Sequence, residues 1–76
     1  MKVNKSQALL FMLSLLLDNK YLTKEHVQSV LSINNLAFAR YIQELKAFFY
    51  NFNYPYELVY VKSKNAYCLI DRHLFK

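Results

Sequence analysis

One apolar repeat in the middle of the chain limits the possible folds more than any other feature. Its members recur every three or four positions, which places them on one face of an α-helix: Phe38, Ile42, Leu45 and Phe49. Asn34, a good helix N-cap residue, precedes the repeat, and Pro55 lies shortly beyond it. We therefore expect a helix from Asn35 to about Asn51, with Tyr41 and Phe48 beside the buried stripe.

Another helix is expected near the N-terminus. Asn4 or Ser6 is its predicted N-cap, and we expect it to run to about Asn19. We assign its core-facing stripe to Leu9, Leu13 and Leu16, flanked by Leu10, Met12 and Leu17. Phe11 and Leu15 then fall on the opposite face. Large apolar side chains exposed there predict a homodimer contact, a protein-partner interface or cover from the chain ends.

Between these two segments the sequence predicts a short helix from Lys24 to Leu31. Thr23 is its expected N-cap, and the acidic Glu25 suits the first turn. Its inner face is predicted to consist of Val27, Val30 and Leu31. Ser32 and Ile33 then form a short turn before the Asn34 cap, so about three residues join the second and third helices.

The last third of the chain is predicted to be a β-hairpin. Two segments rich in β-branched and aromatic residues, roughly Tyr56 to Lys62 and Ala66 to Asp71, are expected to be strands. The chain contains no glycine, so Asn65 is expected to take the left-handed backbone conformation in the turn.

The order of these segments predicts a single α+β domain, residues 1–76, with a winged helix-turn-helix fold. Three helices are followed by a two-stranded hairpin, the wing. The short junction between the second and third helices is typical of helix-turn-helix proteins. Hydrophobic residues make up 55% of the 76 residues, which is high for so small a chain and indicates that some apolar surface contacts a partner.

The central segment, Leu31 to Leu45 (LSINNLAFARYIQEL), resembles the helix-turn-helix core of DeoR and biotin-repressor type transcriptional regulators of bacteria and phages. Ile33 and Asn34 match the family's turn and cap, and Arg40 falls where the family often has an arginine facing DNA. The family's core positions are matched by Phe38, Ile42 and Leu45. Upstream, residues 21–23 resemble the short extended piece that pairs with the wing, and residues 54–70 resemble the wing itself. The resemblance extends from about Ser6 to Asp71.

The chain departs from this family at two places. Ser32 stands where the family usually has glycine, so a serine has to take the turn geometry with some strain. The first turn of the third helix offers Asn35, Leu36 and Ala37, followed by Ala39, where the family usually has Ser, Thr, Lys or Arg.

Together, the resemblance and the side-chain chemistry predict a DNA-contacting set: Asn35, Leu36, Ala37, Ala39, Arg40, Gln43, Lys46, Lys62 and Lys64. Asparagine and glutamine suit adenine, arginine suits guanine, and small or apolar side chains suit the thymine methyl group, so an A·T-rich site is favoured. Lys20, Lys24 and Lys46 are further candidates for phosphate contacts. The alternative is a solvated helix face with no ligand, beside hairpin-tip lysines that only discourage strand pairing.

Charge and composition exclude several other classes of protein. The net charge of +5 favours nucleic acid or another anionic surface, although it also serves solubility alone. Cys68 is the only cysteine and is expected to be a buried thiol, which fits a reducing, cytoplasmic setting.

His26 and His73 have no partners at metal-ligand spacing, and no acid–base pair or glycine-rich loop is evident. The run from Ala8 to Leu17 is too short to cross a membrane. We therefore expect no catalytic residues, no metal or cofactor and no membrane span.

The sequence thus predicts a DNA-binding transcriptional regulator, with the third helix in the major groove of double-stranded DNA and the wing on the flanking backbone. It is expected to act as a dimer on two half-sites. The alternative function is a winged-helix module that binds a protein partner. A third interpretation is that the chain is one domain of a longer regulator.

Overall fold

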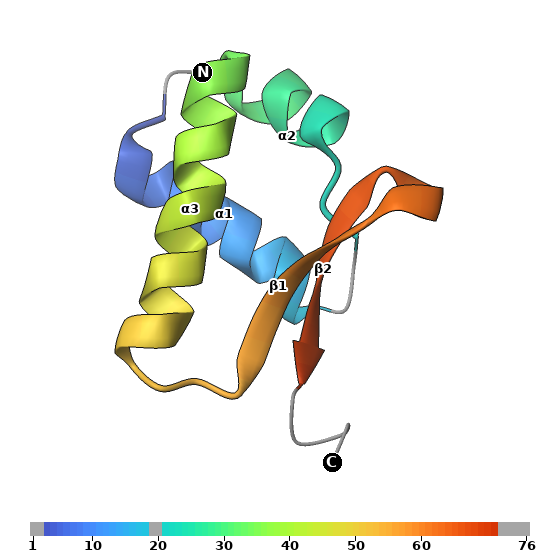
Figure 1. Ribbon diagram of the computed structural model, residues 1–76. Helices are drawn as coiled ribbons and strands as arrows, with labels where there is room; N and C mark the ends of the chain where they lie inside the picture. The colour runs from blue at the N-terminus through green and yellow to red at the C-terminus, as the bar shows by residue number, and fades with distance from the viewer. Residues whose placement is uncertain (1–2, 19–20, 72–76) are drawn as a thin grey trace.

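Three helices precede an antiparallel hairpin in the computed structural model, which describes residues 3–18 and 21–71 (Figure 1). The elements are α1 (Lys5–Leu17), α2 (Lys24–Leu31), α3 (Asn35–Asn51), β1 (Tyr56–Val61), the short 3₁₀ turn η1 (Lys62–Lys64) and β2 (Ala66–Asp71). α3 crosses in front of α1, α2 lies beside one end of α3, and the hairpin extends past the helices (Figure 1). This is the winged helix-turn-helix layout that the sequence predicts.

Each helix begins at a side-chain cap. The side-chain oxygen of Asn4 accepts a hydrogen bond from the Gln7 amide at 2.8 Å, and that of Asn34 accepts one from the Ala37 amide at 2.8 Å. The hydroxyl oxygen of Thr23 accepts a hydrogen bond from the His26 amide at 3.2 Å. The caps satisfy backbone donors that have no partner inside a helix, which confirms Asn4, Thr23 and Asn34 as caps.

The core-facing stripe of α3 is the one that its periodicity predicts. Its four members are no more than 4% exposed: Phe38, Ile42, Leu45 and Phe49. Tyr41 and Phe48 are half-buried and pack against this core, also as expected. The hairpin contributes Leu58, the buried residue at the centre of β1.

The face of α1 that enters the core differs from the prediction. The buried residues are Ala8, Met12 and Leu16. Leu10 is 64% exposed and Leu17 is 52% exposed, so their assignment to the core was wrong. Leu9 and Leu13 are half-buried.

The predicted exposure of Phe11 and Leu15 was also wrong. Both are half-buried and pack against the core, and the Phe11 ring lies 6.2 Å from the ring of His26 on α2. The physical reason is that α1 is apolar around its whole circumference, so its pattern cannot select one inward face. On α2, Val27 and Leu31 are buried as expected, whereas Val30 is 48% exposed and was wrongly assigned to the inner face.

The hairpin is tied to the helices by a third extended segment. β1 and β2 pair from Tyr56↔Asp71 to Val61↔Ala66, so β1 ends one residue earlier than expected. Leu22 forms an isolated bridge to Tyr67, with backbone N–H···O distances of 2.9 and 2.8 Å in the two directions. This bridge confirms the predicted pairing of residues 21–23 with the wing.

Among the residues that the structure describes, three adopt positive φ angles, because the chain has no glycine for its tight turns. Ser32 ends α2 with φ 55°, and Asn65 closes the hairpin turn with φ 49°. Both were expected from the sequence. Asn53, after α3, has φ 56° and was not singled out.

Among the described residues, no helix has the length and apolar character required to cross a membrane.

Candidate nucleic-acid interface

The outward side of α3 presents nearly all of the residues that we assign to DNA contact. Within α3, the exposed members of that set are Asn35, Leu36, Ala39, Arg40, Gln43 and Lys46, whereas Ala37 is half-buried. The helical period places Leu36, Arg40 and Gln43 opposite the buried stripe, whereas Asn35, Ala39 and Lys46 lie beside it, on the side that shares hollows with the hairpin. Lys62 and Lys64 are exposed in η1, at the tip of the hairpin.

A groove of about 500 Å³ lies between α3, the N-terminal end of α2 and the hairpin. It is lined by Lys24, Glu25, Asn35, Phe38, Ala39, Tyr60, Asn65 and Tyr67. We call it the wing groove. Two of the predicted DNA-contacting residues, Asn35 and Ala39, therefore share one hollow with the hairpin.

Side-chain contacts fix the shape of the wing groove. Nε2 of Gln28 on α2 donates a hydrogen bond to Oδ1 of Asn35 on α3 at 2.7 Å. The Tyr60 hydroxyl donates to Oδ1 of Asn65 at 3.0 Å, which ties the end of β1 to the hairpin turn. The first contact holds Asn35 against the preceding helix, and the second braces the wing.

The wing tip is also anchored to the segment before α2. Nζ of Lys64 lies 5.0 Å from the centroid of the Tyr21 ring, a cation–π distance. Tyr21 immediately precedes Leu22, which pairs with β2. Lys64 is thus positioned by its contact with Tyr21 and remains exposed.

Arg40 borders a separate hollow of about 310 Å³ at the N-terminal end of α3, together with Leu36. Lys5 and Glu44 also line this hollow and form an ion pair, with Nζ 2.7 Å from Oε2. Among the described residues this is the only ion pair between side chains, so the carboxylate nearest to Arg40 along the helix already has a cationic partner. The guanidinium group of Arg40 therefore has no acidic partner among those residues.

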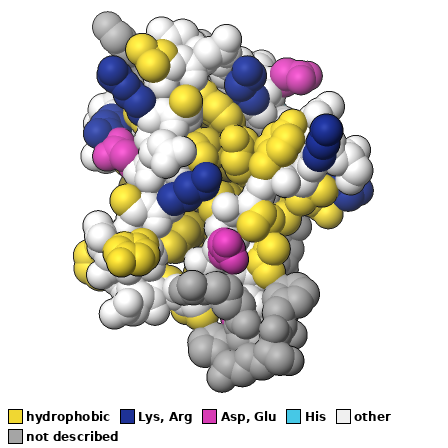
Figure 2. Space-filling view, in the orientation of Figure 1, with side chains coloured by type: hydrophobic (Ala, Val, Ile, Leu, Met, Phe, Trp, Pro, Cys, Tyr) yellow, Lys and Arg dark blue, Asp and Glu magenta, His cyan; other side chains and the backbone are white. Residues whose placement is uncertain are grey.

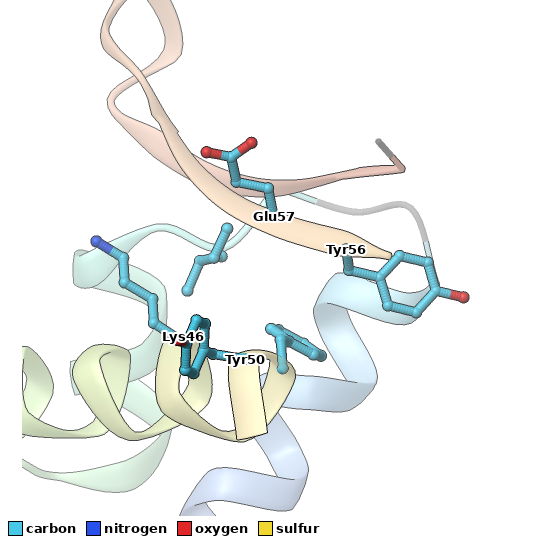
Figure 3. A pocket seen from close by; sticks show the side chains of 6 residues that line it. Lys46, Tyr50, Tyr56 and Glu57 are labelled. Atoms are coloured by element: carbon cyan, nitrogen blue, oxygen red, sulfur yellow. The ribbon is translucent and has the colours of Figure 1, made fainter. Parts of the chain in front are cut away.

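Lys46 and Tyr50 of α3 and Tyr56 and Glu57 of β1 border a third hollow, of about 270 Å³ (Figure 3). Tyr50 is 83% exposed. The carboxylate of Glu57 lowers the positive potential near Lys46. This end of α3 is consequently less suited to a phosphate than the end that carries Arg40.

The structure therefore distributes the predicted site residues over one face rather than gathering them in one pocket. In Figure 2, hydrophobic side chains fill the furrow between α3 and the hairpin, and lysine and arginine side chains lie around it. Lys24 belongs to this face through the wing groove. The other predicted phosphate-contact residue, Lys20, lies outside the described residues.

Tyr60 and Tyr67 are groove residues that the sequence-based prediction missed. They are cross-strand partners with ring centroids 5.1 Å apart, and Tyr67 also lies 6.1 Å from Phe38. Their signal in the sequence is strand alternation, because Tyr60 is two residues from the buried Leu58 and therefore faces the same side. Tyr60 is 51% exposed.

The residues that the structure describes contain no group of three or more His, Cys, Asp or Glu side chains placed to hold a metal ion. His26 is exposed beside Phe11, and His73 lies outside the described residues. Cys68 is half-buried in β2 rather than fully buried.

Comparisons of the chain with protein-family models, curated proteins and solved structures find no match.

Proposed function

We propose that this chain is a sequence-specific DNA-binding regulator of transcription, with α3 as its recognition helix. The observation that supports this proposal best is one exposed helix face bearing Asn35, Arg40 and Gln43 next to a hairpin with two lysines at its tip. α3 has 17 residues and is therefore about 25 Å long, which is ample to lie along a major groove about 12 Å wide.

The chemistry of the face favours a site with several A·T pairs. The amides of Asn35 and Gln43 match the donor and acceptor pattern of adenine, and the guanidinium of Arg40 matches guanine. Leu36, which is 60% exposed, and the methyl group of Ala39 suit contact with thymine methyl groups. Lys24, Lys62 and Lys64 supply positive charge for the flanking phosphates.

The proposal also accounts for the family resemblance of the segment from Leu31 to Leu45. In this interpretation the chain acts like a DeoR or biotin-repressor type winged helix. Ile33 and Asn34 form the turn, and Arg40 faces the bases.

The test begins by selecting binding sites from a pool of random DNA duplexes and measuring the affinity for the selected site at two salt concentrations. Arg40→Ala is expected to weaken specific binding about 5- to 150-fold, because one good bidentate base contact contributes about 1–3 kcal/mol. Arg40→Lys keeps the charge but loses the bidentate fork, so we expect it to reduce specific affinity while leaving non-specific affinity intact.

A pair of glutamines provides a matched control. Gln43 lies on the outward face of α3, whereas Gln7 is exposed on α1. Gln43→Ala is expected to change affinity or base preference, and Gln7→Ala is expected to change neither. If no sequence is enriched, or if Arg40→Ala leaves the affinity for the selected site unchanged, the assignment of α3 as a recognition helix is wrong.

A second candidate function is protein binding through the same face. The exposed Leu36 and Tyr60 favour it, because an apolar surface next to polar groups is typical of protein interfaces. Enrichment of a protein partner that is lost in Leu36→Glu, together with the absence of salt-sensitive DNA binding, would support this function instead.

A further inference from the structure

Asn35, the first residue of α3, has one side of its amide already engaged within the protein. Nε2 of Gln28 on α2 donates a hydrogen bond to Oδ1 of Asn35 at 2.7 Å. Gln28 is half-buried, whereas Asn35 is exposed. An asparagine amide carries one oxygen that accepts and one NH₂ group that donates. The bond from Gln28 therefore turns the oxygen of Asn35 toward α2 and leaves its NH₂ group as the free donor of this side chain.

The junction between α2 and α3 is held by other hydrogen bonds as well. The Ser32 amide donates to the carbonyl oxygen of Gln28 at 2.8 Å and closes the last turn of α2. Oδ1 of Asn34 accepts a hydrogen bond from the Ala37 amide at 2.8 Å and caps α3. Neither bond uses the Gln28 side chain. Loss of that side chain is therefore expected to free the Asn35 amide without displacing α3.

Gln43 provides a contrast on the same helix. Its side chain is exposed and has no hydrogen-bond partner within the described part of the chain. It keeps both a donor and an acceptor, as a bidentate contact with N6 and N7 of adenine requires. Asn35 offers its donor instead. In the major groove, thymine O4 and guanine O6 and N7 accept hydrogen bonds, whereas cytosine offers only the donor N4.

We propose that Gln28 is a positioning residue that makes Asn35 a hydrogen-bond donor to DNA. At the base pair that Asn35 contacts, α3 then prefers thymine or guanine over cytosine. This proposal rests on the proposed DNA binding through α3 and narrows the base chemistry assigned to Asn35. Gln28 acts through Asn35 and needs no contact with DNA of its own.

The experiment compares four duplexes that differ only at the position where Asn35→Ala removes the base preference. The unmodified protein is expected to bind thymine or guanine about 2- to 10-fold better than cytosine, the range that one hydrogen bond provides. In Gln28→Glu, the carboxylate only accepts, so the NH₂ group of Asn35 turns to it and the oxygen faces DNA. The preference is expected to reverse toward cytosine or adenine, whose N4 and N6 donate. Added negative charge weakens all four duplexes alike, so the ratio of affinities isolates the reversal.

Two further variants separate orientation from charge. Asn35→Asp presents an acceptor in either orientation, and an acidic residue suits the first turn of a helix. It is expected to show the same reversal and so calibrates what an acceptor selects at this position. Gln28→Ala removes the bond without adding charge and is expected to abolish the preference for thymine over cytosine. Circular dichroism checks that each variant is folded.

The possible failures are distinguishable. If both Gln28 variants keep the original preference while Arg40→Ala still weakens specific binding, the role of Gln28 is overturned and α3 remains the recognition helix. If Asn35→Ala changes no base preference, Asn35 reads no base and the proposal is wrong. If no DNA sequence is selected at all, the proposed function fails and this inference fails with it.

Discussion

At the residue scale, the turns of this protein are made by residues other than glycine that accept the left-handed conformation. Ser32 has φ 55° and ψ 45° between α2 and α3. For an L-residue this region costs about 1–2 kcal/mol, and asparagine tolerates it better than serine. Asn65 offsets part of its cost, because its side chain accepts the hydrogen bond from Tyr60. Ser32 is therefore the turn position with the most strain to relieve.

Replacing Ser32 with glycine tests this interpretation. Ser32→Gly is expected to raise the free energy of unfolding by about 0.5–1 kcal/mol, because glycine takes the left-handed region without steric cost. Ser29→Gly, three residues earlier within α2, is expected to lower it by about 1 kcal/mol. Urea unfolding curves of the two variants compare these values. Equal destabilisation by both substitutions would show that Ser32 is not strained.

At the element scale, helical periodicity predicts the buried face of α3 but not that of α1. On α3, polar residues alternate with the apolar stripe, so the inward face was predicted correctly from Phe38 to Phe49. On α1, nine of the 13 residues are apolar and surround the axis. Any of several faces satisfies such a pattern, and packing against α3 and the hairpin selects the one that carries Met12.

Two leucines on α1 allow a matched test of its observed orientation. Leu16 is 2% exposed and Leu10 is 64% exposed, although the sequence placed both in the core. Leu16→Ala is expected to reduce the free energy of unfolding by about 2–5 kcal/mol, because it removes buried methyl groups and leaves a cavity. Leu10→Ala is expected to change it by at most about 0.5 kcal/mol. Denaturation is measured for both variants. Similar losses would contradict the observed orientation.

At the scale of the whole molecule, positive charge is unevenly distributed along the chain. All five acidic residues and six of the ten lysines and arginines lie in the described part, which therefore carries a net charge of only +1. The remaining four cations are Lys2, Lys20, Arg72 and Lys76. Within the described part, η1 carries two lysines, Lys62 and Lys64, on either side of Ser63, and no acidic residue. The wing is thus the best-defined site for phosphate contacts in the proposed complex.

The wing lysines lead to a prediction about salt dependence. Lys62→Ala combined with Lys64→Ala is expected to weaken binding to all DNA sequences alike and to reduce the slope of log affinity against log salt concentration by about two, since each lost phosphate contact removes about 0.9. Gel shifts or fluorescence titrations over a range of salt concentrations measure the slope. An unchanged slope would remove the wing from the proposed interface.

The pairing of residues 21–23 with the wing was predicted from the family resemblance alone. The sequence by itself determined the element order, the three helix caps and the inward face of α3. These features depend on local chemistry: a capping oxygen, a helical period broken by polar residues, and a proline after a helix. The exposed face of α3 follows from the same period, so the candidate site residues on α3 were predictable, with Ala37 less exposed than the others.

Only the tertiary structure decided which side of α1 is buried, that Val30 is exposed, and that Tyr60 and Tyr67 meet Asn35 in one groove. Each of these depends on contacts between segments distant in the chain, and an element that is apolar on every side, or a hairpin that extends past its helices, carries no local signal for them. The high apolar content of the chain leaves large apolar side chains exposed on α1. They are Leu10 and Leu17, rather than the Phe11 and Leu15 that the sequence predicted. Packing against α3 and β2 covers one side of this helix and leaves Leu10 and Leu17 exposed on another side.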